Sequence, residues 1–436
     1  MTVTRPVAWW REPTRAQWMT FIAAWMGWVL DAFDFVIFSI VAADIAKEFG
    51  VGPTALAGSI TLTLVVRLAG GFVAGWMADR WGRKLPLMIS LLWFAVFDAA
   101  IYFAPSFAWI LVFRTLFGFG MGAEWTAGTA MAMESFPERS RKIASGLLQA
   151  GWPVGFFAAA LVAHFVVPAF GWRAMFIVAA LPALLVVPIR FLVPDEASKA
   201  KAAAGSAAPQ ISMRDLLAPA VVKKLFVGIG VVGLGFAAYY GMTIHYSMMM
   251  RSELGMTATS GFNMLMIFNV GMGVGVLCAG TVATRYGIVT ALAAPALLMC
   301  LAMPLYVGMV PSLLPLGAFL GGLLGAGYSG VTPVLTTSLF PEHVRARAIG
   351  IVYHGGALLA AFVPTIIGLI AGHTKNLGQT IGIVSAISLA SMACAVFIAR
   401  RMLVITSDAE HAAAAAGVVT TVGDEALLPQ ARIIAA

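Results

Sequence analysis

Long apolar stretches make up most of the chain, and short polar segments separate them. Each stretch is about 20 residues or longer, the length that an α-helix needs to cross the hydrocarbon core of a bilayer. The pattern predicts twelve membrane-spanning helices, at residues 17–43, 55–78, 85–104, 107–133, 143–167, 172–193, 223–247, 260–283, 287–309, 312–338, 347–372 and 377–402.

The two halves of this pattern repeat each other. GWMADRWGRKLPL at 75–87 matches GTVATRYGIVTAL at 280–292, and FPERSRKIASG at 136–146 matches FPEHVRARAIG at 340–350, at nearly the same offset. We therefore expect an all-α integral membrane protein with two pseudo-symmetric six-helix bundles. Duplicated halves of this kind are the layout of carriers whose substrate site lies near mid-membrane between the halves. The expected parts are a cytoplasmic N-terminal segment at 1–16, a first bundle at 17–193 and a cytoplasmic linker at 194–222. A second bundle at 223–402 and a cytoplasmic, disordered tail at 403–436 follow.

Composition agrees with a membrane protein. The chain of 436 residues is 61% hydrophobic and 11% charged, whereas a soluble domain carries about 25% charged residues. The net charge of +8 does not indicate nucleic-acid binding, because the basic residues lie in the connections between apolar runs. The three cysteines show neither metal-ligand spacing nor a disulfide pattern, so we expect no metal site.

The distribution of the 27 Lys and Arg residues predicts the orientation. If both termini are cytoplasmic, nearly all of these residues face the cytoplasm, as the positive-inside rule requires. The exceptions are two within the membrane, Arg67 and Arg114, and four on the far side, Lys47, Arg173, Arg251 and Lys375. We expect a multi-pass protein of a bacterial inner membrane, with a monomer as the functional unit because one chain contains both halves.

Ionisable residues within the predicted spans gather in the first half, which has Asp31, Asp34, Arg67, Asp98, Arg114 and Glu124. A charge near the bilayer centre costs roughly 2.5–3.5 kcal/mol, so such residues usually face a partner or a watery cavity. Asp31 and Asp34 are spaced i, i+3 and therefore share one helix face. A carboxylate that alternates between arginine-paired and unpaired states changes its proton affinity with conformation. These two acids are therefore the predicted proton-coupling groups.

The other intramembrane charges receive subsidiary roles. We expect Arg114 to pair with Asp31 or Asp34, and Arg67 to bind a substrate carboxylate or form a second ion pair. The alternative is that static pairs fix helix packing. Glu124 is either a second protonation site or a neutral acid bonded to a carbonyl. Asp98 lies in a less polar stretch, so we expect it toward the outer side of its bundle and assign it no role.

The loop motif GWMADRWGRK between the second and third predicted spans resembles the signature of the major facilitator superfamily. This resemblance implies a charged latch on the cytoplasmic side that holds a conformational state. Its expected members are Gly75, Asp79, Arg80, Gly82, Arg83, Lys84, Glu134 and Arg139.

A closer resemblance is carried by WREPTRAQWMTFIAAWMGWVLDAFDFVIFSIV, VVRLAGGFVAGWMADRWGRK, RTLFGFGMGAEW and GWRAMF. These segments are similar to the sialate:proton symporter family, which includes bacterial sialic acid permeases and yeast-type lactate and pyruvate permeases. The resemblance is dense over residues 9–195 and thins beyond. In span seven the chain reads GMTIHYSMMM. It keeps His245 and Ser247 of the yeast-type motif but has Gly241, Met248 and Met249 where that motif has hydrogen-bonding side chains.

Further polar and aromatic residues within the spans are candidates for lining a substrate cavity, although a lone histidine in an apolar helix is more often a packing group. They are Gln149, Trp125, Trp152, Tyr240, His245, Asn263, Asn269, Tyr328 and His354.

The resemblance and the buried acids together predict a proton-coupled symporter that imports a small organic acid and uses no cofactor beyond the proton. A monocarboxylate such as lactate or pyruvate is the first expected substrate, and the loss of hydrogen-bonding groups in span seven favours a less hydroxylated molecule. Sialic acid or another sugar acid is the second, and an aromatic acid the third. No nucleophile–base pair or metal-ligand spacing indicates an enzyme, and no output domain supports the remote alternative of a non-transporting membrane sensor.

Overall fold

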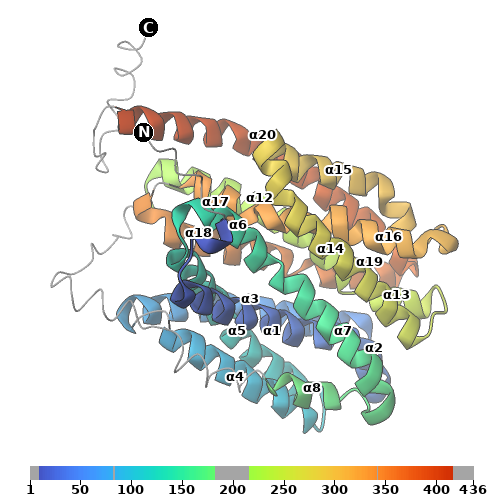
Figure 1. Cartoon of the computed structure of the whole chain (residues 1–436). Coiled ribbons are helices and arrows are strands. Elements are labelled where there is room, and N and C mark those ends of the chain that lie inside the picture. The colour runs from blue at the N-terminus through green and yellow to red at the C-terminus, as the bar shows by residue number, and fades with distance from the viewer. Residues whose placement is uncertain (1–8, 82–83, 182–215, 341, 416–436) are drawn as a thin grey trace.

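The computed structural model describes residues 9–81, 84–181, 216–340 and 342–415, and every regular element in these ranges is helical. The helices run side by side, with the N-terminal half forming the lower layer and the C-terminal half the upper layer in Figure 1. The end of the bundle where α1 begins is called the proximal end below. The opposite end, on the right in Figure 1, carries α2 and α13 and is called the distal end.

The N-terminal half begins with α1, whose first turn is fixed by a capping box between Thr14 and Gln17. In such a box each side chain accepts a hydrogen bond from the other residue's backbone N–H, which satisfies two donors that the helix itself leaves free. The helices of this half are α1 (Arg15–Ile40), α2 (Ala42–Phe49), α3 (Pro53–Trp81), α4 (Lys84–Tyr102), α5 (Phe107–Ser135), α6 (Glu138–Gln149), α7 (Gly151–Phe170) and α8 (Ala174–Ala179).

The C-terminal half repeats this order with more interruptions. The seventh expected span of the chain breaks at His245 into two helices. The tenth contains a π-helical turn followed by a 3₁₀ segment in a glycine-rich stretch. Its main helices are α12 (Pro219–Thr243), α13 (Tyr246–Ser252), α14 (Ala258–Tyr286), α15 (Ile288–Tyr306), α16 (Leu314–Leu320), α17 (Thr332–Leu339), α18 (Glu342–Ala360), α19 (Val363–Thr374) and α20 (Leu377–Ala415).

Within the described residues, ten helices or helix pairs are long and apolar enough to cross a membrane, and the apolar part of α5, Phe107–Gly122, is somewhat shorter. Of the expected sixth span, the part up to residue 181, which includes α8, is described. Residues 182–193 of that span and most of the expected linker at 194–222 lie outside the described part. These elements fit the predicted all-α fold of twelve membrane-spanning helices in two bundles.

Glycines bring α3 and α5 into close contact. A Cβ atom on Gly70 would lie 1.8 Å from the carbonyl oxygen of Phe119. The second half repeats this feature between α14 and the segment after α16, where a Cβ on Gly275 would lie 2.5 Å from the carbonyl oxygen of Leu323. Small residues allow helix backbones to approach closely in membranes, where packing replaces the hydrophobic effect between helices. The sequence repeat is thus also a repeat of packing.

Each half has one glutamate at its distal end, and the two make equivalent contacts. Glu48 accepts hydrogen bonds from Trp172 Nε1 at 2.7 Å and from Arg173 Nη1 at 2.6 Å. Glu253 is the equivalent of Glu48 in the second half, at the same offset as Gly75 and Gly280. It accepts hydrogen bonds from the backbone N–H groups of Leu377 and Gly378. Each glutamate therefore ties the end of a half's first span to the beginning of its last. Partial burial acts to raise the pKa of Glu48, but the bonds from Trp172 and Arg173 outweigh it and hold that pKa below its ordinary value.

The two halves meet mainly where α7 packs on α14 and where α3 packs on α18 and α19. Thr61 Oγ1 donates to the carbonyl oxygen of Ala361 at 2.6 Å and lies 3.0 Å from Thr365 Oγ1. At the distal end Arg251 Nη2 of α13 lies 3.6 Å from Asp44 Oδ1 of α2. The halves are therefore joined by hydrogen bonds between α3 and the start of α19 and, at the distal end, by an ion pair.

We predict that Gly70→Ala destabilises the protein by about 1–3 kcal/mol, the usual cost of overpacking a tight core, because the added Cβ meets the backbone of α5. Gly58→Ala on the same helix is the matched control, since a Cβ there has no neighbour within 4 Å. Thermal unfolding in detergent should show a lower midpoint for the first variant alone. Equal midpoints for the two variants would mean that α3 and α5 separate without cost.

Candidate functional site

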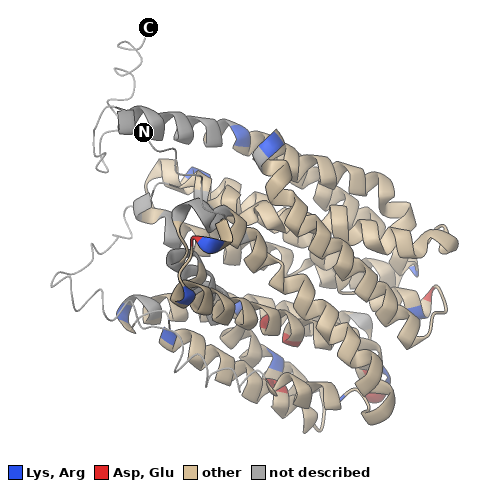
Figure 2. Ribbon diagram, viewed as in Figure 1, with Lys and Arg blue, Asp and Glu red and all other residues tan. Residues whose placement is uncertain are grey.

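Acidic and basic residues occur along the helices of the N-terminal half, whereas the described helices of the C-terminal half carry Lys, Arg, Asp and Glu mainly near their ends (Figure 2). In the N-terminal half Asp31, Asp34, Arg67, Asp98 and Arg114 are buried. Asp31 of α1 and Arg67 of α3 form one buried pair, with Asp31 Oδ2 3.9 Å from Arg67 Nη2 and both side chains at most 1% exposed. This distance exceeds a hydrogen bond. Among the described residues, both oxygens of Asp31 and the Nε and Nη2 atoms of Arg67 have no hydrogen-bond partner. The pair therefore has free donors and acceptors for a ligand.

Arg67 lies at the boundary with the C-terminal half. Its guanidinium carbon is 5.4 Å from the centre of the Tyr353 ring on α18, a distance at which a cation is attracted to the face of an aromatic ring. Phe236 of α12 packs edge-on against Tyr353, with 5.0 Å between the ring centres, and stacks in parallel on Tyr240, with 5.7 Å between the ring centres. The C-terminal half thus presents aromatic rings to the Asp31–Arg67 pair.

The N-terminal half adds aromatic rings to the same region. Phe35 lies 6.2 Å from Tyr240 and 5.8 Å from Trp152, measured between ring centres. Trp152 Nε1 donates a hydrogen bond of 2.6 Å to Tyr239 Oη across the two halves. These rings, together with Trp28, which lies 4.9 Å from Trp152, form what we call the central aromatic cluster: Trp28, Phe35, Trp152, Phe236, Tyr239, Tyr240 and Tyr353.

A second group of charges lies deeper within the N-terminal half and corrects two expectations. Arg114 Nη1 of α5 is 3.7 Å from Asp98 Oδ1 of α4, and both side chains are fully buried. Asp98 therefore does not face the outer side of its bundle, because α4 packs directly on α5 with this side chain turned toward Arg114. Arg114 pairs with Asp98 rather than with the carboxylate of Asp31 or Asp34.

Asp34 contacts Arg114 through its backbone. Arg114 donates to the carbonyl oxygens of Asp34 and Phe35, each at 3.4 Å, and its guanidinium carbon lies 4.5 Å from the centre of the Phe117 ring and 5.1 Å from that of Phe38. The carboxylate oxygens of Asp34 have no hydrogen-bond partner in the part of the chain that the structure describes. Both predicted proton-coupling acids are fully buried in the protein, away from lipid.

Most of the remaining cavity candidates are buried, but they are spread over several contacts. Gln149 Nε2 donates to the carbonyl oxygen of Ser329 at 3.3 Å, which joins the two halves. His245 Nε2 donates to the carbonyl oxygen of Pro364 at 2.8 Å, and Asn269 Nδ2 donates to that of Leu265 at 2.8 Å. Tyr328 packs against Gly235 on α12, and His354 packs against Gly71 on α3.

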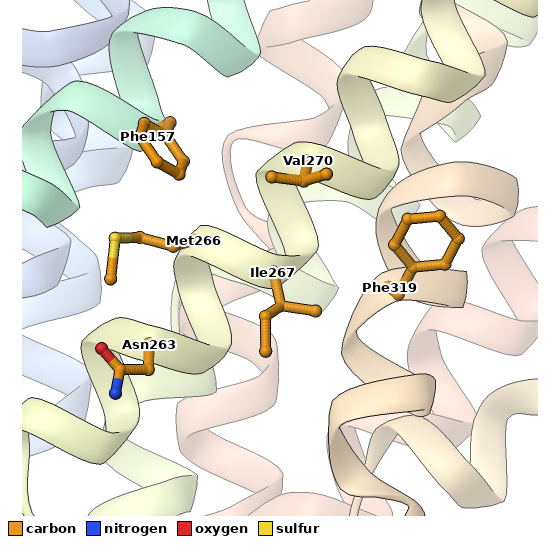
Figure 3. Close-up of a pocket in the computed structure, with 6 residues that line it drawn as sticks. All are labelled: Phe157, Asn263, Met266, Ile267, Val270 and Phe319. Atoms are coloured by element: carbon orange, nitrogen blue, oxygen red, sulfur yellow. The ribbon is translucent and has the colours of Figure 1, made fainter.

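Asn263 differs from the expectation of a central position. Its side chain is exposed and lines a pocket of about 500 Å³ with Phe157 of α7, Phe319 of α16 and three further residues of α14, Met266, Ile267 and Val270 (Figure 3). The α-helical period explains this difference, because Asn263 and Asn269 are six residues apart and face different sides of α14. The other five side chains that line the pocket are apolar.

Several predicted residues cannot be placed. Gly82 and Arg83 lie outside the described residues, as do the side chains of Asp79, Glu124, Trp125, Glu134 and Arg139. Of the other latch candidates, Arg80 is exposed and lies over the rings of Trp76 and Trp81, while Gly75 and Lys84 are half-buried. Within the described ranges no group of three or more His, Cys, Asp or Glu side chains is placed to hold a metal ion.

Residues 20–272, more than half of the chain, match the family model of the Major Facilitator Superfamily. The chain belongs to this superfamily. It is 30% identical over 379 residues to a cis,cis-muconate transport protein of Acinetobacter baylyi, covering 83% of this chain and 89% of that protein. It is 29% identical over 379 residues to a probable 4-methylmuconolactone transporter of Cupriavidus pinatubonensis, covering 84% and 86%.

A solved D-xylose–proton symporter shares the fold, with a TM-score of 0.69 and 17% identity over 86% of this chain and 97% of that one. The fold class and the superfamily predicted from sequence are confirmed, and membership of this superfamily identifies the protein as a membrane transporter. The narrower resemblance to the sialate:proton symporter family stays a prediction.

We predict that Asp31→Asn lowers the free energy of unfolding by about 3–5 kcal/mol, the usual cost of leaving one charge of a buried pair without its partner. The double variant Asp31→Asn/Arg67→Gln should be less destabilised than Asp31→Asn, because no buried charge is left unpaired.

Asp44→Asn is the matched control, because Asp44 and Arg251 are 26% and 29% exposed and such pairs contribute about 0–1 kcal/mol. Chemical unfolding in detergent measures all three variants. Equal losses of unfolding free energy for Asp31→Asn and Asp44→Asn would show that the buried Asp31–Arg67 pair contributes no more to stability than the exposed pair.

Proposed function

We propose that the protein is a proton-coupled symporter that imports a small unsaturated or aromatic carboxylate by alternating access. The observation that carries this proposal is Arg67, a buried guanidinium with unused N–H donors that faces the central aromatic cluster at the junction of the two halves. A guanidinium binds a carboxylate through a fork of parallel hydrogen bonds. The site thus combines one anion-binding group with several flat apolar surfaces.

The central aromatic cluster favours some of the candidate substrates over others. A planar conjugated acid can stack on the rings of Phe35, Tyr240 and Tyr353 while its carboxylate binds Arg67, and offset aromatic contacts contribute about 0.5–1.5 kcal/mol beyond area burial. Lactate and pyruvate, the first expectation from sequence, offer no such surface. The names of the two relatives, muconate and methylmuconolactone carriers, support an unsaturated acid as the substrate class.

Competition for Arg67 supplies a physical basis for proton coupling. When a substrate carboxylate binds Arg67, Asp31 loses its ionic partner and is left as a second anion in a water-poor site, which is costly. Protonation of the Asp31 carboxylate removes that charge, so the substrate anion and one proton enter together. For a substrate with one negative charge, the net charge of the site is then the same with substrate and proton bound as when it is empty. A dicarboxylate such as cis,cis-muconate requires a second proton for the same balance. The two halves can then change between their outward-open and inward-open arrangements in either state.

The distal end is proposed as the extracellular side, with both termini in the cytoplasm and the monomer as the transporting unit. Opening to that side requires the Asp44–Arg251 ion pair and the Thr61–Thr365 contact to separate. Both join α2 or α3 of one half to α13 or α19 of the other, so they break together when the halves rotate apart.

Purified protein in liposomes should accumulate labelled cis,cis-muconate or benzoate when the outside is acidic, and should accumulate lactate and sialic acid at least tenfold less. Arg67→Gln should abolish uptake because it removes the anion-binding group, whereas Arg15→Gln, which changes an exposed arginine at the start of α1, should keep it. Accumulation of sialic acid or lactate above the conjugated acids would instead support the substrate classes ranked first from sequence.

Reversing one charge at the distal end should slow transport. Asp44→Arg places two guanidinium groups opposite each other, which destabilises the closed distal end, and we expect a several-fold lower uptake rate. The exchanged pair Asp44→Arg/Arg251→Asp restores the attraction and should recover most of the rate. If the exchanged pair stays as slow as the single variant, the contact does not act as a distal gate.

A further inference from the structure

We propose that Asp34 and Asp98 share one proton beside Arg114, and that this group is a proton-binding site separate from the substrate pair Asp31–Arg67. The inference rests on the proposed proton-coupled function and adds where the proton is held before substrate arrives. It gives a role to Asp98, which the sequence pattern did not suggest.

The first support is a charge imbalance. Asp31, Asp34 and Asp98 are fully buried, and so are Arg67 and Arg114, at 0–1% exposure. Among the described side chains, three carboxylates therefore face two guanidinium groups. An uncompensated buried charge costs several kcal/mol, and one bound proton balances this group.

The second support is how the acids are distributed. Asp31 has Arg67 as its ionic partner at 3.9 Å, so this pair is neutral by itself. Arg114 serves the remaining two acids, with Asp98 at 3.7 Å and the backbone of Asp34 at 3.4 Å. Two carboxylates that share one site do not both stay ionised, and their titration belongs to the pair rather than to either residue. The proton therefore resides between Asp34 and Asp98.

The third support is the loose hold on Arg114. Its contacts of 3.4–3.7 Å are longer than the 2.7–2.9 Å of a tight charge-assisted bond. The rings of Phe38 and Phe117 keep its guanidinium in place without using its N–H donors. Arg114 can therefore bind Asp98 when Asp34 is protonated and turn to Asp34 when Asp98 takes the proton.

Other charged groups near this site are few in the described part of the chain. Asp31 on α1 and Arg67 on α3 face it, and α8, which packs on both α1 and α4, carries no titratable side chain. His164 on α7 and the acids of α2 lie toward the distal end. Asp34 is one helical turn from Asp31, a rise of about 4.5 Å. When substrate binds Arg67, the O–H bond on Asp34 breaks and one forms on Asp31, and a second proton from the distal side then binds the Asp34–Asp98 pair. One proton therefore enters with each anion, and both buried groups stay neutral.

Infrared spectroscopy of the full-length protein in lipid nanodiscs, without substrate at neutral pH, tests the site directly. We expect the absorption band of a protonated carboxyl in the native protein. Asp34→Asn and Asp98→Asn should each lose it, because one acid then remains for Arg114. Asp31→Asn and the matched control Asp44→Asn should retain it, and Asp98→Glu should restore it. A band that persists in Asp98→Asn, disappears in Asp31→Asn or is absent from the native protein overturns the proposal.

Transport assays separate this inference from the proposed function. Asp98→Asn should lose at least tenfold in accumulation driven by a pH gradient but keep counterflow, in which labelled and unlabelled substrate exchange without net proton movement. Arg67→Gln should lose both. Loss of both activities in a folded Asp98→Asn overturns a proton-only role. Native protein that shows the carboxyl band but no pH-driven uptake keeps the proton site and overturns the symport function.

Discussion

A charge within a bilayer has no water to stabilise it, so the protein must supply the compensation itself. The N-terminal half is organised around this constraint. Each buried guanidinium reaches a carboxylate on a neighbouring helix, and the close packing of α3 against α5 holds both arginines in the same bundle. These contacts are all longer than an ideal ion pair. The charges are therefore compensated, but each arginine can still change its carboxylate partner.

The halves share a backbone plan but differ in chemistry. Glycine contacts and distal glutamates recur in both at equivalent positions. Ionic groups occupy the interior of the first half, whereas the second contributes rings such as Tyr240 and Tyr353 to the junction. Duplication therefore preserved how each bundle is packed, while the residues that face the junction diverged. A ligand at that junction meets charge from one side and aromatic surface from the other.

The sequence predicted the spans, the repeat and the burial of Asp31 and Asp34, because hydropathy and cost of burial are local properties of a segment. It did not predict which acid each arginine meets. Depth along a helix can be counted from the sequence, but helix rotation and neighbour choice depend on packing, so Asp98 beside Arg114 was not foreseen. Of the central aromatic cluster, Trp152 and Tyr240 were predicted to line a cavity, but the other five rings were not. Aromatic residues are common in apolar runs, and the sequence does not distinguish those that converge from exposed ones such as Phe226.

The pair formed by Asp44 and Arg251 differs from the buried pairs because it is about a quarter exposed. Dissolved ions screen such a contact over a Debye length of about 8 Å at physiological ionic strength, and over shorter distances in brine. The attraction between Asp44 and Arg251 is therefore weaker in salty surroundings than in fresh water, whereas the fully buried pairs are far less affected.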